Sequence, residues 1–298
     1  MSSSRLFLLT SLAMLLFAGN SVLCRLAFEH DSIDAASFTG IRLLSGALTL
    51  VLLNYLRQPA ATSVPGEQNA HHGIGGNWLS AIALFVYAAS FSFAYVSLPT
   101  GTGALLLFGA VQATMILAGL RSGEKLSVLQ ISGLLTAMAG LVTIMLPGLS
   151  APSTVGALLM LTAGIAWGIY SLLGRQLTDP TSETAGNFLR AAKLSVLLLL
   201  VRWAHLHLDG WGTGIAVLSG AIASGIGYAI WYAVLPGLTA IRAASVQLSV
   251  PVIAALGGML FLHERITPQL LMASVAILGG ITLVILDKRS ATVRPGEE

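Results

Sequence analysis

The sequence predicts an all-α integral membrane protein with ten transmembrane helices in two inverted five-helix repeats. Hydrophobic residues make up 55% of the 298 residues and charged residues only 9%, whereas a soluble domain carries about 25% charged residues. Because a core of this size cannot bury so many apolar side chains, we expect lipid to be their solvent. Long runs rich in Leu, Ala and Gly favour helices over a β-barrel, since a helix pairs its backbone polar groups internally.

An internal repeat is the second observation. Residues 76–146 align with residues 213–286, and the motif Tyr-x-x-Leu-Pro occurs once in each copy, beginning at Tyr95 and at Tyr232. With five spans in each copy, the second copy enters the bilayer from the opposite side. Inverted repeats of this kind are typical of transporters that work by alternating access and bind their substrate between the halves.

Ten apolar segments account for the predicted spans, each close to the roughly 20 residues that cross a bilayer. They cover residues 5–28, 34–56, 77–97, 100–120, 126–146, 153–175, 186–206, 212–234, 239–261 and 268–286. The domain boundaries that follow are 1–147 for the first repeat, 153–287 for the second repeat and 288–298 for a cytoplasmic tail.

Three segments have special features. The first is expected to be a retained span rather than a signal peptide, since it is long and lacks a small-x-small cleavage site. The seventh is the least apolar, because Arg190, Lys193 and Arg202 interrupt it. Pro251 is expected to break the ninth helix near its centre, because proline donates no backbone hydrogen bond. A broken helix at membrane depth faces protein or a cavity.

Basic residues in the short loops predict that both termini are cytoplasmic. With the N-terminus inside, the basic residues on the inner side are Arg5, Arg57, Arg121, Lys125, Arg175, Lys288, Arg289 and Arg294. Those on the outer side are Arg25, Arg202 and Arg265.

Two fragments that look like cofactor motifs are incomplete. The stretch that begins at His263 has Thr267 where a zinc-protease helix needs its second histidine. The stretch 101–103 lacks the third glycine of a dinucleotide-binding loop, so it is interpreted as a helix N-terminus capped by Thr100 or Thr102. The one cysteine of the chain excludes a disulfide framework. We therefore expect no metal, no cofactor and no catalytic residue.

Polar and aromatic side chains deep within the spans are the candidate substrate-binding residues. Those of the third span recur every fourth residue and so share one face of its helix. The full set comprises Asn20, Arg42, Tyr87, Phe91, Tyr95, Gln112, Trp167, Tyr170, Tyr228, Trp231 and Gln247. Trp and Tyr can instead anchor a helix at the membrane surface. That alternative suits Tyr95 and Tyr232, near span ends, better than Trp167, Tyr170 and Tyr228.

Arginines within the spans also have two interpretations. Arg42 and Arg190 occupy equivalent positions in the second and seventh spans, and Arg242 opens the ninth. Charges at membrane depth are candidates for substrate contact. Each of these arginines nevertheless lies within about two turns of a span end, from which a long side chain can reach the surface.

Acidic residues and histidines lie only in loops or at span ends. A proton-coupled carrier needs a titratable group at depth, so we expect transport without obligatory proton movement, with Lys193 as the one buried candidate for titration. Glu124 and Glu264 follow the fourth and ninth spans, beside Lys125 and Arg265 respectively. Their expected role is local pairing at the membrane surface.

The paired Tyr-x-x-Leu-Pro motifs, the exits at Glu124 and Glu264 and the stretch from Pro251 to Ala255 resemble the drug/metabolite transporter superfamily. Within it they resemble the EamA-type branch, and most closely its YddG-type amino-acid exporters. The resemblance covers nearly the whole chain. It implies ten helices around a central cavity in a bacterial inner membrane, and export of aromatic and other neutral amino acids and related metabolites without enzymatic activity.

Two other functions are compatible with ten spans. A nucleotide-sugar or other metabolite carrier of the same superfamily would need basic residues that converge on a diphosphate at depth, whereas those here lie near span ends. An integral-membrane lipid-modifying enzyme would need an acid/base pair or a metal cluster at the interface, which the loops do not assemble. The expected partners are a small-molecule substrate and the lipid bilayer, with no nucleic acid, and a monomer would suffice.

Overall fold

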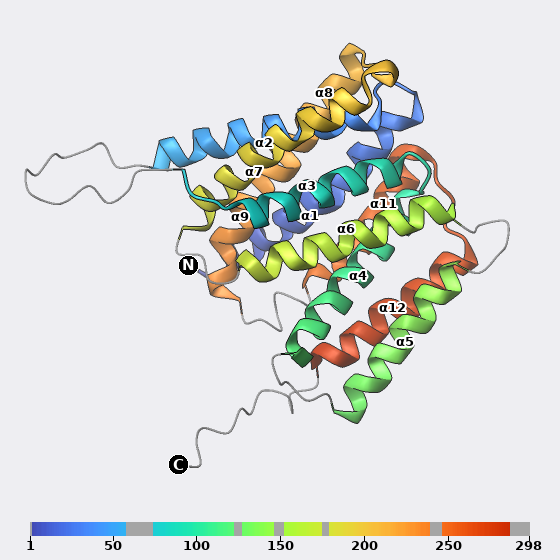
Figure 1. Ribbon diagram of the computed structural model, residues 1–298. Helices are drawn as coiled ribbons and strands as arrows, with labels where there is room; N and C mark the ends of the chain where they lie inside the picture. Colours follow the sequence, from blue (N-terminus) through green and yellow to red (C-terminus); the bar gives the residue numbers. More distant parts are fainter. Residues whose placement is uncertain are drawn as a thin grey trace, which may run out of the picture.

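The computed structural model describes residues 2–57, 74–121, 127–145, 152–174, 179–238 and 246–286. In these ranges the chain is helical, and its one β-type pairing is the isolated bridge between Ile33 and Leu208 (Figure 1). The longer helices are α1 (Ser3–Glu29), α2 (Ala35–Arg57), α3 (Trp78–Tyr95), α4 (Thr100–Arg121), α5 (Val128–Met145), α6 (Thr154–Leu173), α7 (Pro180–Val201), α8 (Gly210–Leu218), α9 (Gly227–Val234), α11 (Ser249–Leu262) and α12 (Pro268–Leu286). Three short elements are η2 (Trp203–His205), the π-helix η3 (Ser219–Ile226) and η4 (Leu235–Gly237).

Each predicted apolar segment overlaps one of these helices or a continuous run of them. Seven described stretches are long and apolar enough to cross a membrane, including α8, η3 and α9 taken together, and α5, α11 and α12 supply shorter apolar helices. The seventh helix begins at Pro180 rather than near residue 186. It starts there because Asp179 accepts a hydrogen bond from the Ser182 amide and because proline suits the first turn of a helix.

The ninth segment is interrupted, although not by a proline in a helix interior. Helix α11 begins at Ser249 after a cap at Leu248, so Pro251 lies in its first turn. A proline costs little there, because the first amides of a helix have no acceptor within it. The preceding residues 239–245, which include Arg242, lie outside the described residues.

Helices α5 and α12 pack side by side at one edge of the molecule (Figure 1). Their backbones approach each other at Gly133 and Gly280, where a Cβ atom on either glycine would meet the carbonyl oxygen of the other. Small residues permit this close approach between helices in lipid.

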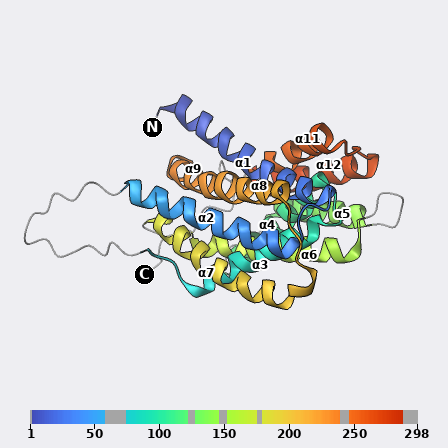
Figure 2. The same cartoon turned by 90° about the horizontal axis from the view of Figure 1, so that it is seen from above.

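The remaining helices form two groups. Helix α1 packs against α8, α9 and α11, whereas α6 packs against α3 and α4. Seen from above, α1 with α8, α9 and α11 lies on one side, and α3 with α6 and α7 on the other (Figure 2). Helices α2 and α7 contact each other, as do α4 and α11. Outward faces are apolar: Leu44, Leu48 and Leu52 recur every fourth residue of α2 and are each more than half exposed, as expected where lipid is the solvent.

Asp34 joins two turns at the end of the bundle where α2 begins. Its carboxylate accepts hydrogen bonds from the amides of Ala36 and Ser37, at 2.9 and 3.0 Å, and from the amide of His207 at 3.0 Å. Burial alone would raise the pKa of this carboxyl, but the hydrogen bonds outweigh burial and lower the pKa below its ordinary value.

Candidate functional site

A small cavity lies near the centre of the bundle, between the two groups of helices. Its lining comes from α1, α3, α4, α6, η3, α9 and the short turn before α11. The lining residues are Phe17, Asn20, Ser21, Tyr87, Phe91, Leu107, Phe108, Trp167, Ala223, Tyr228 and Gln247. The cavity volume is about 20 Å³, which is room for roughly one water molecule. The cavity is therefore too small for an amino acid in this conformation.

Aromatic rings form most of the cavity wall. The ring centroids of Tyr87 and Trp167 are 4.9 Å apart, and those of Trp167 and Tyr228 are 5.1 Å apart with the rings nearly perpendicular. Phe91 continues the wall one turn along α3, 5.5 Å from Tyr87. Edge-to-face and tilted pairs at these distances are favourable. The wall thus offers flat apolar surfaces to a ligand that carries a ring.

Arg42 lies directly behind this aromatic wall and is only 2% exposed. Its Nε donates to the Ser224 hydroxyl at 3.3 Å and its Nη2 donates to the Tyr87 hydroxyl at 3.1 Å. The guanidinium also lies 4.8 Å from the centroid of the Phe91 ring, a cation–π distance. Its Nη1 finds no hydrogen-bond acceptor among the described residues, and the buried hydroxyl of Tyr228 finds no partner there either.

A π-helical segment positions Ser224, one of the two hydrogen-bond partners of Arg42. Residues of η3 pass so close to α2 that a Cβ atom on Gly220 would meet the Arg42 carbonyl oxygen, so only glycine fits there. One turn on, η3 presents Ser224 to the guanidinium. Its first residue, Ser219, donates to the Asn20 side chain at 2.5 Å. Short π segments are rare and are frequent at functional sites.

The structure corrects two expectations about buried cations. Arg42 does not extend to the membrane surface, because Ser224 and the hydroxyl of Tyr87 hold its guanidinium inside the bundle. Lys193 is not buried: it is exposed and lines a groove between α2 and α7 with Gly40 and Leu199. The expectation that Lys193 is buried is therefore wrong.

Arg190 of α7, which the sequence pairs with Arg42, has acceptors of its own. Its Nη1 donates to the carbonyl oxygens of Gly75 and Gly186 at 2.8 and 3.0 Å. The charge of Arg190 is therefore solvated by backbone dipoles, whereas that of Arg42 is held by two hydroxyl groups and two aromatic rings.

Six of the candidate residues meet at the cavity, and the others lie around it. The lining includes Asn20, Tyr87, Phe91, Trp167, Tyr228 and Gln247. Tyr170 contacts Trp167 at 5.6 Å between centroids, and Trp231 contacts Phe17 at 6.0 Å. Gln112 is buried in α4 but is not part of the lining. The lining also includes Phe17, one helical turn before Asn20, which was not among the residues predicted from the sequence.

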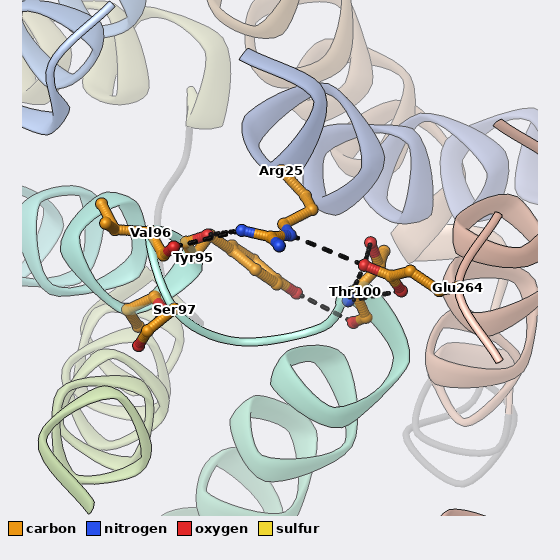
Figure 3. Close-up of polar contacts among 7 residues, drawn as sticks. Arg25, Tyr95, Val96, Ser97, Thr100 and Glu264 are labelled. Carbon is orange, nitrogen blue, oxygen red and sulfur yellow. Dashed lines mark hydrogen bonds and ion pairs between the residues drawn. The ribbon is translucent and has the colours of Figure 1, made fainter. Parts of the chain in front are cut away.

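A second polar cluster lies at the end of the bundle where α3 turns into α4 (Figure 3). Arg25 of α1 donates to the carbonyl oxygens of Tyr95 and Val96 at 3.2 and 3.1 Å, and its Nε lies 3.6 Å from the Glu264 carboxylate. The same carboxylate accepts hydrogen bonds from the amide of Thr100, at 2.8 and 3.0 Å, and from its hydroxyl at 3.1 Å. We call these residues the outer polar network.

This network corrects three expectations. Glu264 pairs with Arg25, far away in the sequence, rather than with its neighbour Arg265. The Glu264 carboxylate, not a threonine, caps the first turn of α4. Glu124, the predicted counterpart of Glu264, lies outside the described residues. Tyr95 is fully buried rather than at the surface.

Tyr95 joins the outer polar network to the cavity wall. Its hydroxyl donates to the Thr100 carbonyl oxygen at 3.3 Å, and its ring meets Phe91 edge-on at 4.7 Å. The ring lies over the first turn of α4, where a Cβ atom on Gly103 would overlap it. A change at the outer polar network therefore has a direct packed route to the cavity.

Comparisons with known proteins agree with this architecture. Residues 154–286 match the EamA-like transporter family. An uncharacterized protein of Pseudomonas aeruginosa is 55% identical over 296 residues, which cover 99% of this chain and all of the relative. A crystal structure with 20% sequence identity superposes with a TM-score of 0.66 over 97% of this chain and 100% of the other, which shows the shared fold.

Two more distant relatives carry functional names. A probable amino-acid metabolite efflux pump of Escherichia coli is 25% identical over 232 residues, 72% of this chain and 78% of the relative. A probable terminal-alkyne amino-acid exporter of Streptantibioticus cattleyicolor is 28% identical over 224 residues, 72% of this chain and 75% of the relative.

Proposed function

This chain belongs to the EamA-like transporter family, and from that premise we propose that it exports amino acids from the bacterial cytoplasm. The substrates are aromatic and other neutral amino acids and related metabolites. They cross the inner membrane by alternating access through the central cavity. The names of the two distant relatives, an amino-acid efflux pump and an amino-acid exporter, support this substrate class.

The observation that carries the proposal is the closed aromatic cavity between the two groups of helices. Rings such as Trp167 and Tyr228 suit the side chain of an aromatic amino acid, while Asn20, Ser21 and Gln247 supply polar groups. A volume of about 20 Å³ cannot hold an amino acid, so substrate enters only when the halves move apart. Carriers of this type open alternately to either side.

The arrangement of the helices supports two inverted repeats, 1–147 and 153–287. In the two repeats α1 corresponds to α6, and α3 corresponds to the run of α8, η3 and α9. The contact between α3 and α6 then corresponds to the contacts of α8 and α9 with α1. In the same way the contact of α4 with α6 corresponds to that of α11 with α1, and the contacts of α2 with α7 and of α5 with α12 correspond to themselves. A pseudo-two-fold axis in the membrane plane gives this correspondence.

With both termini in the cytoplasm, the outer polar network lies at the periplasmic end. It joins α1, the turn between α3 and α4, and the turn between α11 and α12. We propose that it closes this end while substrate loads from the cytoplasm. Separation of Arg25 from Glu264 then accompanies release.

Counterflow in proteoliposomes tests the function. Vesicles that contain the purified full-length protein and unlabelled phenylalanine should accumulate labelled phenylalanine transiently, and protein-free vesicles should not. No acidic residue is among the described lining of the cavity, so a substrate gradient alone should drive flux and an imposed pH gradient should not concentrate substrate. Absence of counterflow for every amino acid in a neutral panel would contradict the proposal, and accumulation driven by a pH gradient would contradict uncoupled transport.

A further inference from the structure

We infer that Arg42 and Tyr228 bind the carboxylate of the substrate, and that the site recognises aromatic carboxylates whether or not they carry an α-amino group. The inference rests on the proposed function and makes it narrower, because it says which part of an amino acid the protein reads. A fixed positive charge behind one wall and neutral groups in the lining would select by charge as well as by shape.

The first argument is the unsatisfied donor on Arg42. A guanidinium has five N–H groups and remains charged at any physiological pH. Among the described residues Arg42 has two hydroxyl acceptors, Ser224 and Tyr87, while Nη1 has none and no carboxylate forms an ion pair with it. Buried charges in proteins are normally paired. An anionic ligand would supply the missing acceptor and the missing charge together.

The second argument is the hydroxyl of Tyr228, which is buried and has no partner in the described part of the chain. Its ring lines the cavity and meets Trp167 edge-on. Buried polar groups are almost always hydrogen-bonded, so one that is not needs an explanation. A carboxylate has two oxygens and could accept from the hydroxyl of Tyr228 as well as from Arg42.

Access to Arg42 depends on the same rings that line the cavity. The guanidinium contacts the faces of Tyr87 and Phe91, at 5.3 and 4.8 Å from their centroids, and both residues belong to the lining. Ser224, which holds Nε, follows the lining residue Ala223. When the cavity widens to admit a substrate, the rings of Tyr87 and Phe91 lie between the substrate and the Arg42 guanidinium.

The third argument concerns the amino group. The described polar lining consists of Asn20, Ser21 and Gln247, all neutral. No carboxylate in this lining offers a strong site for an ammonium ion. The carboxylate is therefore the charged group that the site reads, and a substrate that carries only an ammonium group would place it beside Arg42 without compensation.

Competition experiments separate these predictions. In the phenylalanine counterflow assay, 3-phenylpropionate, which lacks the amine, should inhibit with a potency within about threefold of phenylalanine itself. Phenethylamine, which lacks the carboxylate, should be at least about 30-fold weaker, since a buried charge left unpaired is strongly unfavourable. Equal inhibition by phenethylamine and 3-phenylpropionate would overturn the inference.

Variants provide the second test. Arg42→Gln should raise the phenylalanine concentration that half-saturates counterflow by about 30-fold or more, and Arg42→Lys should retain part of the affinity because it keeps the charge. The matched control is Arg190→Gln, which removes the same group from the corresponding position of α7 and should leave the half-saturating concentration unchanged. A folded Arg42→Gln protein with wild-type saturation would overturn the inference.

Binding without transport distinguishes this inference from the proposed function. In detergent, 3-phenylpropionate should raise the melting temperature of the wild-type protein and of Arg190→Gln, but not that of the double variant Arg42→Gln,Tyr228→Phe. If this pattern appears while no amino acid shows counterflow, the proposed function is wrong and the carboxylate site stands. If phenylalanine is transported but 3-phenylpropionate stabilises no variant and does not compete, the carboxylate site is wrong and export stands.

Discussion

Arg42 of α2 and Arg190 of α7 both lie within a membrane-spanning helix, yet their surroundings are opposite. Arg190 donates to two backbone carbonyl groups near the start of its own helix. Arg42 is enclosed by aromatic rings and hydroxyl groups, and its Nη1 has no acceptor in the described part of the chain. The difference teaches that a charge within a span marks a binding site only when its local acceptors are insufficient. Sequence position alone treats the two arginines alike.

The largest expected effect comes from replacing each of the two arginines, one at a time, with leucine. Arg42→Leu should abolish amino-acid counterflow while leaving the melting temperature equal or higher, because replacing a poorly compensated buried charge is often neutral or stabilising by about 1–4 kcal/mol. Arg190→Leu should do the reverse: transport by each folded molecule persists, and stability falls with the loss of two hydrogen bonds. Similar effects of the two substitutions on both measurements would remove the distinction between the halves.

Trp167 tests whether the rings beside Arg42 serve the substrate or only packing. Trp167→Ala should reduce transport several-fold more than it reduces the amount of folded protein, because the ring lines the cavity. Loss of a fully packed tryptophan would instead cost about 3–5 kcal/mol of stability. The control is Trp203→Ala, since Trp203 is 74% exposed and contacts no part of the site. Transport that tracks stability alone in Trp167→Ala would mean that the ring is structural.

Arg25 provides a third arginine for the comparison, one paired with a carboxylate. Glu264→Ala should lower stability by about 1–3 kcal/mol, since it leaves a partly buried amide and a charged group without their acceptor. Glu264→Gln, which can still accept from Thr100, should cost roughly half as much. Thermal unfolding in detergent measures both. If Glu264→Ala is as stable as wild type, the outer polar network contributes nothing to closure of that end.

The smallest effect concerns Asp34. Its pKa is lower in the folded protein than its ordinary value, so its stabilising contribution is complete above that ordinary pKa and is lost as pH falls through the lowered one. The melting temperature should therefore decline below about pH 4, by less in Asp34→Asn than in wild type. Identical pH profiles for the two proteins would show that the carboxylate makes no net contribution to stability.

The sequence was sufficient for the fold and for the faces of the helices, and insufficient for contacts between distant segments. Apolar runs of about 20 residues predicted the spans, and the four-residue spacing of Tyr87 and Phe91 placed both on the cavity wall. The partners of Glu264 and Arg42 could not be predicted, because they depend on which helices pack together. For Glu264 the adjacent charge in the sequence, Arg265, was the wrong guide.

The first turn of α4 is capped by Glu264, a residue of the turn between α11 and α12 rather than of α4 itself. The first amides of a helix need an external acceptor, and that of Thr100 has one only while the α11–α12 turn is docked. Opening of this end of the bundle thus loosens the first turn of a helix as well as breaking an ion pair. Deuterium uptake at residues 100–103 would then report the population of the open state, in an unlabelled protein and in a native membrane.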